Sequence, residues 1–286
     1  MKRKTSAALG CFLLFFSSCT TVTSYTYGPD SLLLNPAMET SLPPEGFRED
    51  NLKAEDGTAL NILYNSVLED YEYCVLYLHG NGDTVWSAGL RPFYSLLNAG
   101  GLVVCAVDYR GYGKSGGQSA IDTLQEDART AYDFLSRHFD PGRIIIWGKS
   151  LGTVPALLLA RDRPESPLVL ESTISNLEDL EGPLERLFST RFRKVDLILR
   201  NTGTFDNTLA VKGIHNRTFM IHGEEDPLAG FDSARKMYED IPAAGKTFIP
   251  LPGEGHNYSS FSVLRNPLEI ILTSIKNGEE APHERT

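Results

Sequence analysis

The sequence has few cysteines and few histidines, and these shortages argue against a metal site. Four cysteines occur in 286 residues, and no two of them have the spacing of a metal-binding pair. None of the six histidines has a partner at the spacing of a helical zinc motif. We therefore expect no metal site. Two of the cysteines, Cys74 and Cys105, lie in apolar stretches, and we expect both to be buried free thiols.

Positive charge and long apolar runs are also scarce. Lysine and arginine number 27 against 37 aspartates and glutamates, which gives a formal net charge of −10. Such a balance argues against general nucleic-acid binding, which requires a basic surface. The apolar stretch at residues 7–16 is shorter than the roughly 20 residues that span a bilayer. No repeat or low-complexity block interrupts the chain, so one large domain is expected.

The amino-terminal segment has the pattern of an export signal. Three cations at positions 2–4 precede the apolar stretch, and small residues follow it. The segment resembles a bacterial lipoprotein signal, which implies cleavage after residue 18, lipidation of Cys19 and attachment to the cell envelope. An ordinary cleaved signal and an uncleaved anchor are the alternatives. Removing residues 1–18, which hold three cations and no acid, changes the net charge to −13.

Beyond Cys19 the sequence predicts three regions. Residues 19–45 are rich in Ser, Thr, Tyr and Pro without periodicity, which predicts a tether. Residues 46–276 alternate strand and helix patterns and predict one α/β domain, a mostly parallel twisted sheet with helices on both faces. Residues 277–286 predict a polar tail.

A serine turn is the most informative pattern. The β-branched run at residues 144–146 leads into Gly148-Lys149-Ser150-Leu151-Gly152, and a helical pattern follows. This Gly-x-Ser-x-Gly sequence between a strand and a helix is typical of a nucleophile elbow, which holds a serine in a strained conformation. The glycines let strand and helix approach closely. The alternative is a glycine-rich turn with a solvated serine.

Two further positions have the residue types that activate a serine. Asp226 follows the apolar strand at residues 218–223, and His256 lies in a glycine-rich loop after the strand at residues 246–251. The order Ser, Asp, His is that of a serine hydrolase, in which the histidine removes the serine proton and the acid orients the histidine. Glu224 and Glu225 are alternatives to Asp226.

The turn at residues 79–83, after the apolar strand at residues 73–78, predicts an oxyanion site. Two backbone N–H groups, one from Asn81 and one from Leu151, would stabilise the negative charge of the intermediate. Gly82 is the alternative to Asn81. His79 and His222 each end a strand before a glycine, and we assign them to ordering the loops.

Five ordered motifs resemble the BEM46-like branch of the α/β-hydrolase superfamily over residues 46–276. They are His79-Gly80-Asn81-Gly82, the loop at residues 108–115, the serine elbow, Asp226-Pro227 and Gly255-His256-Asn257. The resemblance implies an α/β-hydrolase fold and a serine hydrolase that cleaves acyl esters or thioesters without a cofactor. It also implies a substrate pocket lined by His79, Gly80, Gly82, Tyr109 and Tyr112. Thr153 departs from the small residue that is common there.

The resemblance also implies a cap insertion at about residues 172–216. The apolar spacing there predicts helices, through Leu184, Leu187 and Phe188 and then through residues 195–199. Residues 186–200 hold five cations and one acid, a net charge of +4. Two interpretations remain open: a cap that faces anionic lipid head groups, or a solvated cap that only covers the core.

Together these observations predict a membrane-tethered, monomeric esterase or thioesterase that acts on a small acyl substrate. An amidase or peptidase acting on small exported peptides is the enzymatic alternative, because the same three residues cleave both bond types. A non-catalytic lipoprotein that uses the scaffold for binding is the second alternative.

Overall fold

The computed structural model describes residues 21–27, 43, 45–68, 71–189, 193–199 and 205–277. The predicted signal at residues 1–18 and Cys19 lie outside the described residues, as do nearly all of the predicted tail and the cap cations Arg191 and Arg200. No helix in the described ranges combines the length and apolar character that crossing a bilayer requires.

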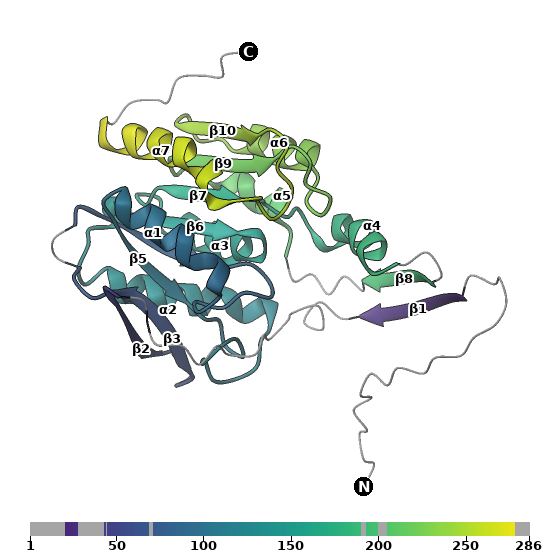
Figure 1. Ribbon diagram of the computed structural model, residues 1–286, viewed down its shortest axis with the longest axis horizontal. Helices are drawn as coiled ribbons and strands as arrows, with labels where there is room; N and C mark the ends of the chain where they lie inside the picture. Colours follow the sequence, from purple (N-terminus) through teal and green to yellow (C-terminus); the bar gives the residue numbers. More distant parts are fainter. Residues whose placement is uncertain are drawn as a thin grey trace, which may run out of the picture.

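Eight strands form one sheet at the centre of the molecule (Figure 1), in the spatial order β10-β9-β7-β6-β4-β5-β3-β2. Strands β10 to β5 run parallel, whereas β3 pairs antiparallel with both β5 and β2. The strands are β2 (Phe47–Lys53), β3 (Ala59–Asn65), β4 (Tyr73–Leu78), β5 (Leu102–Val107), β6 (Ile144–Lys149), β7 (Leu168–Glu171), β9 (Thr218–Gly223) and β10 (Lys246–Leu251).

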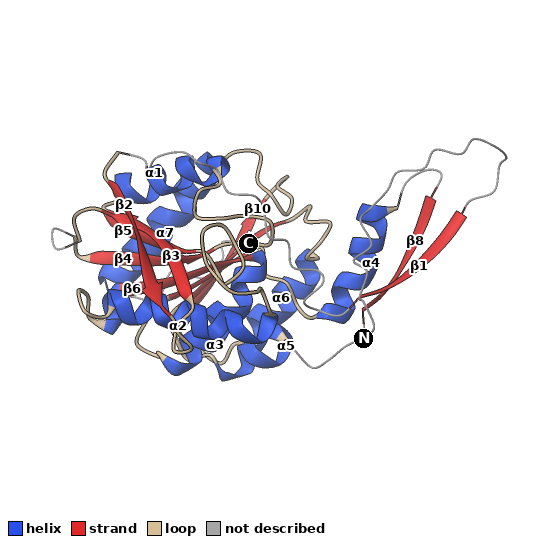
Figure 2. Cartoon of the chain, turned by 90° about the horizontal axis from the view of Figure 1, so that it is seen from below, coloured by secondary structure: helices blue, strands red, loops and turns tan. Residues whose placement is uncertain are grey.

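Helices cover both faces of this sheet, as the sequence predicts. Figure 2 shows α1 and α7 on one face and α2, α3 and α6 on the other. The helices are α1 (Arg91–Ala99), α2 (Leu124–Leu135), α3 (Thr153–Asp162), α5 (Asn207–Ala210), α6 (Phe231–Asp240) and α7 (Arg265–Asn277).

The central strands are buried on both faces, and alternate side chains enter different clusters. In β4, Cys74 and Leu76 join the cluster beneath α2 and α3, whereas Val75 and Tyr77 join the cluster beneath α1 and α7. Cys74 and Cys105 are buried free thiols, as predicted. Burial raises the pKa of the Cys105 thiol to about 12.

The region after β7 differs in part from the prediction. Helix α4 (Leu177–Phe188) is helical as expected, and the side chain of its N-cap, Asn176, accepts a hydrogen bond from the backbone N–H of Asp179. Residues 195–199, however, belong to strand β8 (Arg193–Leu199) and not to a helix.

The partner of β8 also corrects the tether prediction. Strand β8 pairs in parallel with β1 (Thr21–Tyr27), a segment expected to be an aperiodic tether. Figures 1 and 2 show this two-stranded ribbon beside α4, away from the main sheet. Threonine and tyrosine in β1 and β-branched residues in β8 favour extended backbone. Local patterning did not indicate the pairing because the two segments are far apart in sequence.

Candidate active site

The loops after the parallel strands meet at one edge of the sheet, and Ser150 lies at their centre. Strand β6 ends at Lys149, residues Ser150–Gly152 form a tight turn, and α3 begins at Thr153. Ser150 has a φ of 51°, in the left-handed region that residues with a Cβ atom rarely adopt. A Cβ atom at Gly148 would lie 2.4 Å from the Gly152 carbonyl oxygen, and one at Gly152 would lie 2.0 Å from that of Leu78. The predicted reason for the two glycines is therefore confirmed.

Ser150 and His256 are joined directly. The Oγ atom of Ser150 lies 2.8 Å from Nε2 of His256, whose loop follows β10. On its other side, Nδ1 of His256 lies 2.8 Å from Oδ2 of Asp226. A carboxylate only accepts, so Nδ1 carries the proton and Nε2 presents a lone pair to the serine hydroxyl. This arrangement can draw the hydroxyl proton toward the imidazole.

Asp226 is held in place by its own turn. Its Oδ1 atom accepts the backbone N–H groups of Leu228 and Ala229 at 2.9 and 2.8 Å. Burial acts to raise the pKa of the Asp226 carboxyl, but the hydrogen bond and charge of His256, with the two backbone donors, hold it below its usual value. The alternatives Glu224 and Glu225 are exposed on the same turn. The structure therefore places Asp226, and neither glutamate, against His256.

His222 lies behind Asp226 and orders the same turn. Its Nε2 donates to the Ala229 carbonyl at 2.7 Å and lies 3.5 Å from Oδ2 of Asp226. Burial lowers the pKa of this imidazole, although the Ala229 hydrogen bond and the Asp226 charge act in the opposite direction. A neutral His222 with its proton on Nε2 satisfies these contacts. The prediction that His222 orders a loop agrees with this position.

The turn predicted to hold the oxyanion lies against the serine. A Cβ atom built on Gly80 would be 3.5 Å from the Cβ atom of Ser150. Gly82 has a φ of 85°, which glycine adopts without strain. The Asn81 side chain accepts a hydrogen bond from the Tyr112 hydroxyl at 2.7 Å, which fixes the turn from one side.

Three of the five residues predicted to line the pocket lie beneath this turn. His79, Tyr109 and Tyr112 have no exposed surface, and the Tyr109 hydroxyl donates to the His79 carbonyl at 3.0 Å. The ring centroids of His79 and Tyr109 are 4.5 Å apart. This burial corrects the prediction for these three side chains: they support the turn because the loop at residues 108–115 folds inward. Gly80 and Gly82 remain in the turn itself.

A charged pair next to the serine was not predicted. Lys149 and Glu171 are register partners on β6 and β7, both are buried, and Nζ lies 3.7 Å from Oε1. Trp147 donates to the other carboxylate oxygen at 2.7 Å. Burial raises the pKa of Glu171, against the opposing effects of Lys149 and Trp147. A glutamate that ends an apolar strand is the sequence signal that could have indicated the pair.

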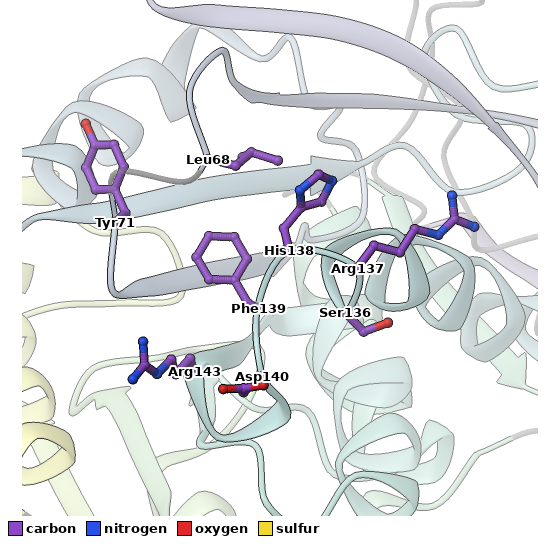
Figure 3. Close-up of a pocket in the computed structure, with 8 residues that line it drawn as sticks. All are labelled: Leu68, Tyr71, Ser136, Arg137, His138, Phe139, Asp140 and Arg143. Atoms are coloured by element: carbon purple, nitrogen blue, oxygen red, sulfur yellow. The ribbon is translucent and has the colours of Figure 1, made fainter.

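A pocket lies near the amino-terminal ends of strands β4 and β6 and contains none of the predicted site residues. It has a volume of about 300 Å³ and is shown in Figure 3. Its lining comes from the end of α2, the turn before β6 and a preceding loop: Leu68, Tyr71, Ser136, Arg137, His138, Phe139, Asp140 and Arg143. Within the described ranges, no group of three or more His, Cys, Asp or Glu side chains is arranged to hold a metal ion.

Comparisons with known proteins find a family model and several relatives that this chain resembles. Residues 70–201 match the family described as serine aminopeptidase, S33. The chain is 31% identical over 198 residues to the lysophosphatidylserine lipase ABHD12 of Bos taurus, covering 65% of this chain and 49% of that protein. It is 31% identical over 242 residues to the protein of the same name from Xenopus tropicalis, covering 76% and 61%. The chain thus spans about half the length of the bovine relative.

Solved structures show the same fold. An esterase of Pyrococcus furiosus superposes with a TM-score of 0.69 at 18% identity, covering 86% of this chain and 97% of that chain. Est1E of Butyrivibrio proteoclasticus superposes with a TM-score of 0.61 at 14% identity, covering 80% and 99%. At these identities the likeness concerns the fold. With the eight-stranded sheet, it shows that the chain has the α/β-hydrolase fold.

Proposed function

We propose that this protein is a serine hydrolase that cleaves carboxylic esters or thioesters of acyl substrates, with Ser150, His256 and Asp226 as its catalytic residues. The observation that carries the proposal is the hydrogen-bonded series from Ser150 Oγ through His256 to Asp226, with both contacts at 2.8 Å. The left-handed backbone of Ser150 presents its hydroxyl at the end of β6, where the neighbouring loops meet.

In the first half-reaction His256 takes the hydroxyl proton as Ser150 Oγ attacks the substrate carbonyl. The carbonyl electrons move to the oxygen, which the N–H groups of Asn81 and Leu151 stabilise, with Gly82 as the alternative to Asn81. When this intermediate collapses, the leaving group departs with the proton from His256 and an acyl-serine remains. Water, deprotonated by His256, then releases the carboxylic acid and restores Ser150. No cofactor enters either half.

The names of the relatives support a substrate class for this proposal. Proteins named lysophosphatidylserine lipase share 31% identity with this chain, and the Pyrococcus furiosus protein of similar fold is named an esterase. We therefore place esters that carry one acyl group, among them lysophospholipids, first among candidate substrates. The order of the five motifs along this chain also supports membership of the BEM46-like branch.

The test is labelling with a fluorophosphonate probe alongside hydrolysis of p-nitrophenyl esters of graded chain length. Wild type should be labelled and active, and Ser150→Ala should be neither while keeping its fold. Ser136→Ala, which removes an exposed serine hydroxyl at the end of α2, is the matched control. Labelling that persists in Ser150→Ala would assign the nucleophile elsewhere.

A second candidate activity is cleavage of amides or small peptides. The matched family model is described as a serine aminopeptidase, and the catalytic series acts on either bond. Aminoacyl p-nitroanilides assayed beside acyl esters of similar size separate the two. A higher kcat/KM for the anilides would favour the peptidase.

We further propose that the protein is exported and tethered to the bacterial cell envelope through lipidated Cys19, as a monomer. The support is the signal pattern at residues 1–18 and the cysteine that follows it. Radiolabelled palmitate should enter the wild-type protein in growing bacteria and should not enter Cys19→Ser. Labelling of Cys19→Ser at the wild-type level would contradict lipidation at this position.

A further inference from the structure

Two neighbouring strands end in the same unusual way at the site. Lys149 of β6 and Glu171 of β7 are register partners, and each is followed by a serine with positive φ. The φ angles are 51° for Ser150 and 48° for Ser172. Among the residues that the structure describes, these are the only non-glycine positions with positive φ. Such a conformation persists only where the surroundings impose it.

Ser172 directs its side chain at the loop that carries His256. Its Oγ donates to the His256 carbonyl at 3.2 Å and lies 3.4 Å from the Tyr258 hydroxyl. Because Ser172 has one hydroxyl proton, the Tyr258 hydroxyl can supply the proton for the second contact. The backbone N–H of Ser172 donates to Ile221 at 3.0 Å, so the residue itself is fixed to the sheet.

The rest of the loop lies on the charged pair beside Ser172. Lys149 Nζ is 5.5 Å from the centre of the Tyr258 ring and 5.4 Å from that of Phe261. The Glu171 carboxylate, whose Oε1 atom lies 3.7 Å from Lys149 Nζ, balances this positive charge. Attraction between a cation and aromatic faces holds the segment after His256 against the strand ends.

We propose that Ser172 is a positioning residue that fixes the backbone of His256, so that the imidazole meets Ser150 in a reactive geometry. Two strained serines therefore hold His256: Ser150 contacts its ring, and Ser172 contacts its main chain. The positive φ of Ser172 directs its hydroxyl away from the strand and toward the loop that carries His256. This inference rests on the proposed function.

Two substitutions separate the hydroxyl from the backbone strain. Ser172→Ala removes the hydroxyl and keeps a Cβ atom at positive φ, whereas Ser172→Gly removes the hydroxyl and relieves the strain. The control is Thr173→Val: the Thr173 hydroxyl is buried and has no hydrogen-bond partner among the described residues. Ester hydrolysis, fluorophosphonate labelling and thermal unfolding are measured on all four proteins.

If Ser172 positions His256, kcat falls about 10- to 100-fold in both Ser172→Ala and Ser172→Gly while KM stays within about twofold of wild type. The rate of labelling at Ser150 should fall in proportion. Ser172→Gly should unfold at a higher temperature than Ser172→Ala. The two variants should therefore differ in stability although both lose activity. Thr173→Val should retain wild-type kcat.

Two results would overturn the positioning role alone. One is a wild-type kcat in both Ser172 variants. The other is a kcat and an unfolding temperature that are both restored in Ser172→Gly relative to Ser172→Ala. A wild-type protein that neither reacts with the probe nor hydrolyses esters would instead overturn the proposed function. The two failures are therefore distinguishable.

Discussion

Asp226→Asn is expected to abolish most of the activity while leaving the fold intact, because of how the turn holds this side chain. One carboxylate oxygen accepts two backbone N–H groups, and the other faces His256 Nδ1 at 2.8 Å. In the asparagine variant the carbonyl oxygen keeps the two N–H donors. The amide NH₂ must then point at His256, whose Nδ1–H group needs a hydrogen-bond acceptor at that position.

The imidazole will therefore carry its proton on Nε2, facing the Ser150 hydroxyl, and cannot act as the base. The loss of kcat expected for such a wrong tautomer is about 10⁴-fold. That factor corresponds to about 5 kcal/mol of transition-state stabilisation. Steady-state hydrolysis of a short p-nitrophenyl ester at neutral pH measures it, and Glu225→Gln on the same turn is the control. A kcat for Asp226→Asn within tenfold of wild type, or a large loss in the control, would refute the reasoning.

The same variant tests the pKa of Asp226. Although burial opposes it, contact with His256 and the two backbone donors lowers this pKa in the folded state. The ionised carboxylate thus stabilises the folded protein above the unfolded-state pKa, and this contribution is lost as the pH falls through the folded-state pKa. The difference in unfolding free energy between wild type and Asp226→Asn should shrink as the pH drops from about 5 to about 2. Urea titrations monitored by fluorescence measure it, and a difference that stays constant over this range would contradict the assignment.

Two other perturbations test the frame around the site. Gly152→Ala puts a Cβ atom 2.0 Å from the Leu78 carbonyl oxygen and should cost about 3 kcal/mol or more in urea unfolding. Gly89→Ala, at a position with open space around it, should be close to neutral; similar stability of the two variants would contradict the close approach. Lys149→Met leaves the buried Glu171 carboxylate unpaired and should destabilise by about 3–5 kcal/mol. Adding Glu171→Gln should recover part of that loss, and a double variant less stable than Lys149→Met would show that the two side chains do not act as a pair.

Much of the site was predictable because its signals are local. A β-branched run, two glycines and a following helix mark the turn at Ser150 within one short stretch. Asp226 and His256 each follow an apolar strand, and parallel strands deliver the loops at their carboxyl ends to one edge. The order of the motifs along the chain was enough to expect these side chains near one another. The sequence left the two neighbouring glutamates as alternatives to Asp226, and the structure places Asp226 against His256.

What could not be predicted depends on contacts between distant segments. The positive φ of Ser172 follows from its position between β7 and the His256 loop, and serine itself has no preference for that conformation. The burial of Tyr109 and Tyr112 depends on the inward fold of their loop, which residue type does not reveal. Strand β8 forms only with β1 as its partner, so local periodicity could not distinguish it from a helix.

The contacts around His256 bear on its proposed role as a base, because they hold the side chain of a loop residue in one position. Its ring is fixed by Ser150 and by Asp226, and its main chain by Ser172. Asp226 is in turn unable to rotate, because two backbone N–H groups hold one oxygen while His256 and His222 flank the other. Each of these groups lies at or just beyond the end of a parallel strand, so the sheet limits the movement of the imidazole. In the proposed mechanism, the entropy of aligning base and nucleophile is thus lost when the protein folds, before substrate arrives.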